Sequence, residues 1–321
     1  MAPKQQKSPV GAGLNRNNHS RQYITTTPDC HPSYAFWGVM QAVFGRGIPY
    51  PLADGKPHRF HVAGDRSGTR NGWYVLHMGI IAWGRFGTWK SDDIHRWKSR
   101  APANPLEAHL IRQQHMHARL LHEAKLHRCQ EQAAEKANRW WRQARHATPD
   151  HPYLIRKGIK PHNARQRGSE LLIPLYFEGK LVSLQRIKPN GEKRFLPGGR
   201  VSGCYSPLGK VTPGEPLHIC EGWATGATIH EETGHAVACA MNCGNLLAVG
   251  EYLRRLYPEV GLIFAGDDDR KTEGNPGRTA ATKAAAALDC ELVFPPWPKD
   301  APTNLSDFND LRQWRIGNES P

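Results

Sequence analysis

Acidic side chains follow two short apolar segments in the last third of the chain. Glu221 comes directly after LHIC and stands before a glycine. Three aspartates, Asp267, Asp268 and Asp269, come directly after VGLIFAG. Because side chains alternate between two sides of an extended segment, Asp267 and Asp269 project to one side and Asp268 to the other. If the two apolar segments are neighbouring strands, we expect Asp267 and Asp269 to face Glu221.

Carboxylates that converge in this way repel one another, so their pKa values rise or a cation joins them. Mg²⁺ prefers oxygen ligands and is held by one or two carboxylates, with water and substrate phosphates completing its coordination. The sequence therefore predicts a Mg²⁺ site at Glu221, Asp267 and Asp269, with Asp268 as a further candidate ligand and Mn²⁺ as an alternative ion. Either acidic motif alone would be typical of a solvated loop or a helix cap.

The residues that must position these acids alternate between strand and helix patterns. Strand patterns at LHIC, HAVACA, VGLIFAG and CELVFP are separated by helix patterns at EGWATGATIHEETG, NLLAVGEYLRRLYP and GRTAATKAAAALD. This order predicts an α/β fold with a mostly parallel sheet and flanking helices. Active groups of such sheets lie outside the carboxyl ends of the strands, which is where both acidic motifs stand.

Composition divides the whole chain into five predicted parts. Residues 1–28 are polar and basic and are predicted to form a flexible tail, and 29–100 a small β-rich module. Residues 101–147 are predicted to form a basic helical linker, with Asn104 and Pro105 at its start. A small α+β basic subdomain, 148–212, precedes the α/β domain at 213–321.

Several cations stand where they could bind a phosphate backbone. Four of them lie beside glycines in the turn segment KPNGEKRFLPGGRVSG, and two follow the aspartates: Lys188, Lys193, Arg194, Arg200, Arg270 and Lys283. The alternative for the first four is an ordinary hairpin tip. The basic face of the helical linker is a second candidate surface, and a solvated helix face explains it equally well.

The overall charge and the cysteines limit the class of protein. A formal charge of +14, from 43 Lys and Arg against 29 Asp and Glu, favours nucleic acid as a partner. No segment approaches the roughly 18 apolar residues of a membrane span, and the start MAPKQQKSPV lacks a leader's apolar core, so we expect a soluble, cytoplasmic protein without a membrane partner. The seven cysteines contain no Cys-x-x-Cys pair, so no disulfide framework and no zinc are predicted.

The acidic motifs resemble a known family. ICEGWATG, AGDDDR and GRTAATKAA resemble the EG and DxD motifs of Toprim domains, which bacterial-type primases, topoisomerases and some nucleases share. YLIRKGI, LLIPLY and SLQRIKPNGEKRFLPGG resemble the basic subdomain that precedes Toprim in primases of phages, plasmids and other mobile elements, and DGKPHRFHVAGDRSGTRNGWYVLHM with FGTWKS resembles their front module. The chain departs from the pattern by inserting KTEGNP after Arg270 and by lacking an intact zinc ribbon.

This resemblance implies template-directed synthesis of short RNA primers on single-stranded DNA from NTPs. A 3′-hydroxyl would attack an α-phosphate, with Asp267 and Asp269 carrying Mg²⁺ and Glu221 acting as base or further ligand. Lys193 and Arg194 would hold phosphate. Asp307 and Asp310, in SDFNDL, resemble the late acidic motif of phage primases, although a helix cap explains them as well.

Two other functions fit the same residues. A Toprim nuclease would use these carboxylates to hydrolyse phosphodiesters, and a non-catalytic DNA-binding accessory protein would keep the metal site alone. A topoisomerase is disfavoured because a strand-passage domain with a nucleophilic tyrosine cannot be placed in 321 residues. GCYSPLGKV does not have the spacing of a P-loop, so no helicase motor is predicted and a separate replicative helicase is the expected partner.

Overall fold

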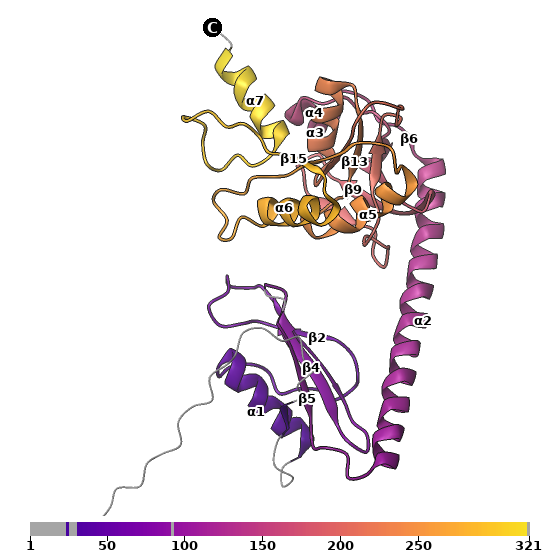
Figure 1. The fold of residues 1–321 in the computed structure, drawn as a ribbon, viewed down its shortest axis with the longest axis vertical. Coiled ribbons are helices and arrows are strands. Elements are labelled where there is room, and N and C mark those ends of the chain that lie inside the picture. Colours follow the sequence, from indigo (N-terminus) through magenta and orange to yellow (C-terminus); the bar gives the residue numbers. More distant parts are fainter. Residues whose placement is uncertain (1–23, 26–30, 91–92, 320–321) are drawn as a thin grey trace, which may run out of the picture. The chain divides into compact units, whose positions relative to one another are not determined.

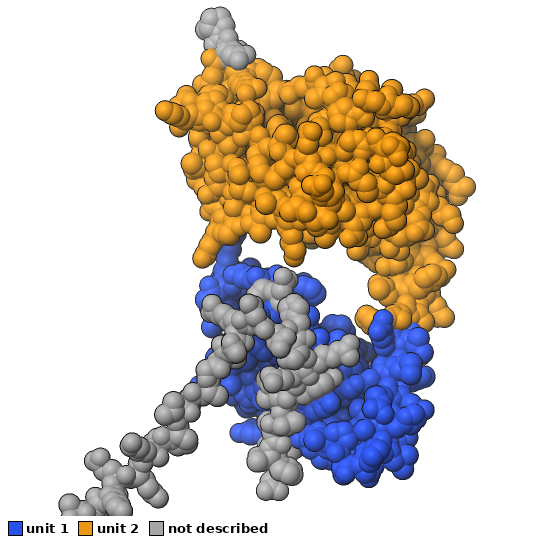
Figure 2. Space-filling view, in the orientation of Figure 1, with its two compact units in different colours: residues 1–120 blue, residues 121–321 orange. Residues whose placement is uncertain are grey.

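The computed structural model describes residues 24–25, 31–90 and 93–319. Contacts divide the chain into two compact units, residues 1–120 and 121–321, which Figure 2 shows in different colours. The division falls inside the long helix α2 (Pro105–Gln143), so each unit is described by itself. The predicted tail, residues 1–28, falls outside the described residues apart from 24–25, and the five-part division of the chain stays a prediction.

Unit 1 is a five-stranded sheet with one helix against it (Figure 1). The strands follow the order β1-β5-β4-β3-β2 and are antiparallel except for the β1–β5 pair. Their bounds are β1 (Ile24–Thr25), β2 (His58–Phe60), β3 (Gly72–His77), β4 (Trp83–Thr88) and β5 (Ile94–Lys98). The prediction of a β-rich module is confirmed, but it missed helix α1 (Pro32–Phe44).

Helix α1 forms because its start is capped and one face is apolar. The His31 ring accepts a hydrogen bond from the Ser33 N–H at 3.3 Å, and a proline occupies the first turn. Phe36 is fully buried and packs on the sheet, where a Cβ on Gly84 would lie only 2.6 Å from its ring. Helix α1 therefore covers the face of the sheet to which Gly84 and Phe86 belong.

Helix α2 leads into a second antiparallel sheet, of order β10-β9-β8-β7-β6. Its elements are β6 (Arg145–His146), α3 (Pro152–Lys157), β7 (Arg165–Arg167), β8 (Glu170–Phe177), β9 (Lys180–Ile187) and β10 (Lys193–Phe195). The predicted hairpin at EGK is confirmed, with Glu178 and Gly179 both at positive φ between β8 and β9. Alternate residues of β8 face opposite sides: Leu172 packs with Ala137 of α2, whereas Leu171 packs toward the third sheet.

The third sheet carries the acidic motifs. Its order is β11-β13-β12-β14-β15, and every pairing is parallel except that of β11. The strands are β11 (Ser206–Leu208), β12 (Leu217–Cys220), β13 (Ala236–Cys239), β14 (Leu262–Ala265) and β15 (Glu291–Val293). The helical elements are α4 (Trp223–Thr233), η1 (Cys243–Asn245), α5 (Leu246–Leu256), α6 (Pro276–Leu288) and α7 (Phe308–Glu319). The predicted α/β fold class is confirmed, while β11 was not predicted.

The third sheet is covered on both faces, which explains why its strands are almost wholly apolar. Helix α4 lies on one face together with the second sheet, and α5 and α6 lie on the other (Figure 1). Gly226 lets α4 approach closely, because a Cβ there would lie 2.3 Å from the Cys239 sulfur. In the part of the chain that the structure describes, no helix has the length and apolar character to span a membrane.

Candidate active site

Glu221 leaves the sheet at the carboxyl end of β12, as predicted. It stands between buried Cys220 and Gly222, which precedes the first turn of α4. Burial, followed by the nearby charge of Asp269, raises the pKa of the Glu221 carboxyl, although the Cys243 backbone N–H and the charge of Lys193 act in the opposite direction. The site therefore holds this carboxyl closer to neutrality than an exposed glutamate, which suits a group that exchanges protons.

Asp267 stands at the carboxyl end of the neighbouring strand β14, and the pKa of its carboxyl group is strongly perturbed. Burial, together with the charges of Asp307, Glu221 and Asp269, raises its pKa to about 9. Its Oδ1 atom is buried and has no hydrogen-bond partner in the protein. A buried acceptor in this condition is costly, and a cation at this edge would remove the cost.

Asp269 and the inserted loop hold each other in place. The Asp269 Oδ2 atom accepts the Gly277 N–H at 3.0 Å, which places the carboxylate at the start of α6. Asn275, at a φ of 40°, accepts the Asp269 N–H at 2.8 Å through its side chain. The KTEGNP insertion thus turns back onto the acidic segment, and a Cβ on Gly277 would lie 2.9 Å from the Asp269 carboxylate.

Asp268 points away from this edge, in agreement with the predicted alternation. Its Oδ1 atom accepts hydrogen bonds from Arg278 Nε at 2.9 Å and from Asn275 Nδ2 at 2.7 Å. The hydrogen bond from Arg278 is the main reason that the pKa of Asp268 lies below its ordinary value. These two hydrogen bonds hold Asp268 to the inserted loop and to the start of α6, and its role as a metal ligand stays a prediction.

Asp307 and Asp310 combine the two roles that the sequence left open. Asp307 caps α7, since its Oδ1 accepts the Asp310 N–H at 2.8 Å. Asp307 is also the largest charge acting on the pKa of Asp267, so it lies at the same acidic edge. Burial, followed by the charge of Asp310, raises the pKa of Asp307 itself.

Of the six cations predicted from sequence, the structure brings Lys193 toward the acids. Its charge lowers the pKa values of Glu221, Asp267 and Asp307. Lys188 and Arg194 instead both bind Glu192, at 2.7 and 2.8 Å.

The remaining three cations lie elsewhere. Arg200 stacks on the ring of Phe177, with its Cζ atom 3.3 Å from the ring centroid. Arg270 donates to the carbonyl oxygen of Pro302 at 2.8 Å, and Lys283 is exposed on α6. Arg200 therefore lies against an aromatic ring and Arg270 binds a loop carbonyl group, and their assignment to phosphate binding stays a prediction.

Lys157 was not predicted from sequence, yet it reaches the acidic edge. Its Nζ atom lies 3.1 Å from Asp310 Oδ1. Burial lowers the pKa of Lys157, but the charges of Asp307 and Asp310 outweigh this effect and hold the pKa above its ordinary value. The sequence feature that could have indicated Lys157 is its position inside YLIRKGI, a segment that resembles the basic subdomain of primases.

The acids fit Mg²⁺ but do not form a complete cage. Within the described ranges, no three Asp, Glu, His or Cys side chains lie close enough to bind one ion by themselves. Mg²⁺ does not need such a cage, because one or two carboxylates suffice when water and substrate phosphates supply the other oxygens. The unpartnered Oδ1 of Asp267, with Asp269 and Glu221 beside it, meets that requirement.

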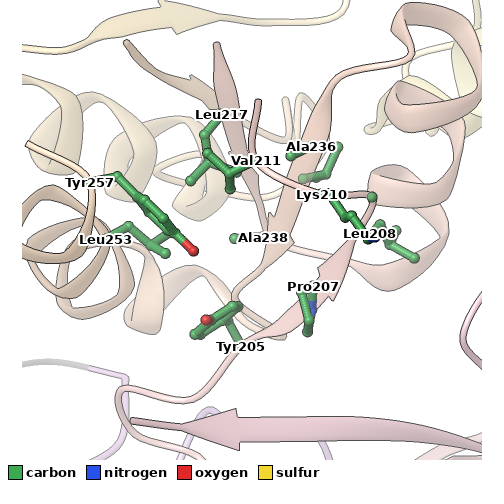
Figure 3. A pocket seen from close by; sticks show the side chains of 12 residues that line it. Tyr205, Pro207, Leu208, Lys210, Val211, Leu217, Ala236, Ala238, Leu253 and Tyr257 are labelled. Carbon is green, nitrogen blue, oxygen red and sulfur yellow. The ribbon is translucent and has the colours of Figure 1, made fainter. Parts of the chain in front are cut away.

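A cavity of about 330 Å³ lies at the opposite end of the third sheet (Figure 3). Its wall includes Leu217 and Ala236, the first residues of β12 and β13, together with Tyr205 and Tyr257. The acids follow the last residues of the parallel strands, so this cavity is separate from the candidate active site.

Comparison with known proteins first defines the class. Residues 216–316 match the model of the Toprim domain, so this part of the chain is a Toprim domain. Over a longer stretch the chain is similar to the DNA primase TraC of Escherichia coli, at 35% identity over 285 residues, or 82% of this chain and 27% of the relative. A second Escherichia coli protein named DNA primase TraC is 33% identical over 277 residues, or 80% of this chain and 19% of the relative.

These matches confirm the resemblance to Toprim-domain primases. The chain spans about a quarter and a fifth of the lengths of the two curated relatives. Among solved structures, the DnaG primase catalytic domain bound to ssDNA aligns with a TM-score of 0.39 and 13% identity, over 61% of this chain and 77% of that chain. A DNA primase domain from Pseudomonas aeruginosa aligns with a TM-score of 0.30 and 13% identity, over 44% of this chain and 47% of that chain. Likenesses this distant locate no functional residue in this chain.

Proposed function

We propose that this chain synthesises short RNA primers on single-stranded DNA by Mg²⁺-dependent nucleotidyl transfer. The observation that carries the proposal is the position of Glu221 and Asp267 at the carboxyl ends of two neighbouring parallel strands, with Asp269 two residues further on and a buried oxygen of Asp267 left without a partner. The similarity to DNA primases over 82% of the chain supports polymerisation rather than another use of this edge. Replication of a phage, plasmid or other mobile element, in the cytoplasm and beside a separate helicase, is the proposed setting.

In the proposed reaction the 3′-hydroxyl oxygen of the primer forms a bond to the α-phosphorus of an NTP. The bond from that phosphorus to the bridging oxygen breaks, and pyrophosphate leaves. Glu221 accepts the hydroxyl proton, a role that its raised pKa favours. Asp267 and Asp269 would hold the Mg²⁺ ion, which when bound neutralises charge on the reacting phosphates. Lys193 faces the same edge and binds phosphate.

One assay separates the proposed function from its alternatives. The protein is incubated with single-stranded DNA, labelled NTPs and Mg²⁺, and the products are resolved by length. Labelled oligoribonucleotides support the proposal. Shortened DNA without labelled products would identify a Toprim nuclease, and DNA binding without either product would identify an accessory protein.

Lys193 and Arg194 are neighbours on β10 but should contribute differently to DNA binding. Replacing Lys193 with Ala should flatten the plot of log binding constant against log salt by about 0.7, the contribution of one phosphate contact on a single strand. Arg194→Ala should change the slope less, because Arg194 is already bound to Glu192. Titrations at several salt concentrations give the slopes; equal slopes for wild type and Lys193→Ala would exclude this contact.

The part of the unit 1 sheet that lies away from α1 and beside Trp89 offers a second surface for single-stranded DNA. Trp89 is 67% exposed, and its ring centroid lies 5.9 Å from that of Trp73. The Arg59 guanidinium lies 6.0 Å from the Trp89 ring, and Arg59 pairs with Trp73 across β2 and β3. Exposed indoles beside cations can stack unpaired bases and bind their phosphates. We therefore assign single-stranded DNA binding to this face as well.

Trp89→Ala should weaken binding of single-stranded DNA, because stacking of one base contributes roughly 1–3 kcal/mol. Tyr34→Ala is the matched control, since Tyr34 is 56% exposed but lies on α1, which covers the other face of the sheet. Fluorescence anisotropy with a labelled oligonucleotide measures both. If both variants lose affinity equally, or neither does, Trp89 is not a stacking platform.

A further inference from the structure

The end of helix α3 is tied to helix α7, although the two are far apart in sequence. Asn309 Nδ2 and Gln313 Nε2 donate to the carbonyl oxygen of Lys157 at 2.8 and 2.9 Å. Arg312 donates to the carbonyl oxygen of Gly158 at 2.6 Å. The last carbonyl groups of a helix lack partners within it, and here side chains of α7 supply them. The backbone at Lys157 therefore has a fixed place relative to α7.

Two further features stabilise the contact between the end of α3 and helix α7, which we call the junction. Asn309 is fully buried and also donates to the Thr228 hydroxyl of α4 at 2.9 Å. Gly158 has a φ of 58°, a left-handed conformation that favours glycine, and it lies against the Gln313 side chain, whose Nε2 would be 2.5 Å from a Cβ there. These contacts fix the position of the Lys157 backbone, from which its side chain extends.

From this junction the Lys157 side chain reaches the first turn of α7. Its Nζ atom binds one oxygen of Asp310 at 3.1 Å, and the other oxygen accepts the Ser306 N–H at 3.2 Å. The N–H of Asp310 donates to Asp307 at 2.8 Å, and the carbonyl of Ser306 accepts the Asp268 N–H at 2.7 Å. A continuous set of contacts thus joins Lys157 to Asp307 and to the segment that carries Asp267.

We infer that Lys157 is a positioning residue for nucleotidyl transfer: by holding Asp310 in its ion pair, it keeps Asp307 fixed beside Asp267 and keeps Asp310 itself from joining the metal site. The inference rests on the proposed function and assigns this role to the subdomain upstream of the Toprim domain. Lys157 acts through Asp310 and Asp307, so it needs no contact with substrate. The Lys157 and Asp310 side chains are 25% and 24% exposed, so removing one of them leaves the other partly buried without its partner. The double variant removes both and so separates this effect on folding from an effect on function.

The test compares full-length wild type with Lys157→Met, Asp310→Asn and the double variant. Lys160→Met is the matched control, because Lys160 is an exposed lysine three residues further along. Each protein is measured for its melting temperature without metal, for the Mg²⁺-induced rise in melting temperature, and for primer synthesis at saturating Mg²⁺. Lys157→Met should remain folded at the assay temperature and lose roughly 10- to 100-fold in turnover, since a small misplacement at a reacting centre has that effect.

The Mg²⁺-induced rise in melting temperature distinguishes a positioning role of Lys157 from a purely structural one. In Lys157→Met the Mg²⁺-induced rise should be at least as large as in wild type, because Asp310 has lost its cation and becomes available to the metal. The double variant should be no slower than Lys157→Met, because the two residues act as one unit. Lys160→Met should match wild type throughout.

Two results would overturn the inference. One is wild-type turnover in Lys157→Met; the other is joint loss of melting temperature and Mg²⁺ response, which would make Lys157 a structural support only. If wild type itself makes no primers, the proposed function fails. The Mg²⁺ response of Lys157→Met then still decides whether Lys157 keeps Asp310 away from the metal.

Discussion

Glu221→Gln should abolish primer synthesis while leaving the fold intact. The substitution keeps the size of the side chain but removes its ability to accept a proton, and loss of a general base costs roughly 10²- to 10⁴-fold in rate. Burial already raises the pKa of this carboxyl, so the neutral amide should be tolerated in the folded protein. Primer synthesis under single-turnover conditions measures the loss, and circular dichroism checks the fold.

The matched control for this variant is Glu251→Gln, because Glu251 is an exposed glutamate on α5. Glu251→Gln should synthesise primers at the wild-type rate. Undiminished synthesis by Glu221→Gln would remove Glu221 from the catalytic machinery, and an equal loss in both variants would point to a general effect of charge.

Stability without metal should fall as the pH rises from about 4 to about 9, and Mg²⁺ should reverse that fall. Asp267 has a pKa of about 9 in the folded protein against 3.8 as an ordinary aspartate. Between these values the folded state holds a proton that the unfolded state has released, so raising the pH favours unfolding. Mg²⁺ binds the ionised site of the folded protein and stabilises it by RT ln(1 + [L]/Kd), about 2.7 kcal/mol at a concentration of 100 Kd.

Thermal melts over this pH range, with and without Mg²⁺, test the prediction. Asp267→Asn should flatten the pH dependence, and the double variant Asp267→Asn, Asp269→Asn should lose the Mg²⁺ response. Asp289→Asn serves as control, since Asp289 lies at the far end of α6 from Asp269. A double variant that still responds to Mg²⁺ as wild type does would place the ion at another site.

The acidic edge could be predicted from sequence because its geometry is local. Strand periodicity placed Glu221 and Asp267 at the same edge, and alternation along an extended segment separated Asp268 from its neighbours, as the bond to Arg278 now shows. The helix patterns also predicted the helices that flank the sheet, since α4, α5 and α6 all form where they were expected.

The features that sequence reasoning missed depend on contacts between distant residues. Lys193 and Arg194 looked equivalent, but Arg194 lies opposite Arg186 on β9 and binds Glu192, whereas the charge of Lys193 acts on the acids. The position of Lys157 near the acids could be recognised only from its ion pair with Asp310, which is 153 positions away in the sequence. Helix α1 was missed because an apolar segment among strand patterns does not reveal its period.

The contact between Lys157 and Asn309 also determines how early the acidic edge can be completed while the chain is made on the ribosome. The two residues are 152 positions apart, so at about 5–20 residues per second the ribosome needs about 8 to 30 s to make the second after the first. Late in that interval the growing chain carries β12 and Glu221, but the end of α3 still has no α7 to bind. We therefore expect a nascent chain that has emerged only as far as α6 to carry Glu221, Asp267 and Asp269 but to lack β15, Asp307 and the side chains of α7 that bind the end of α3.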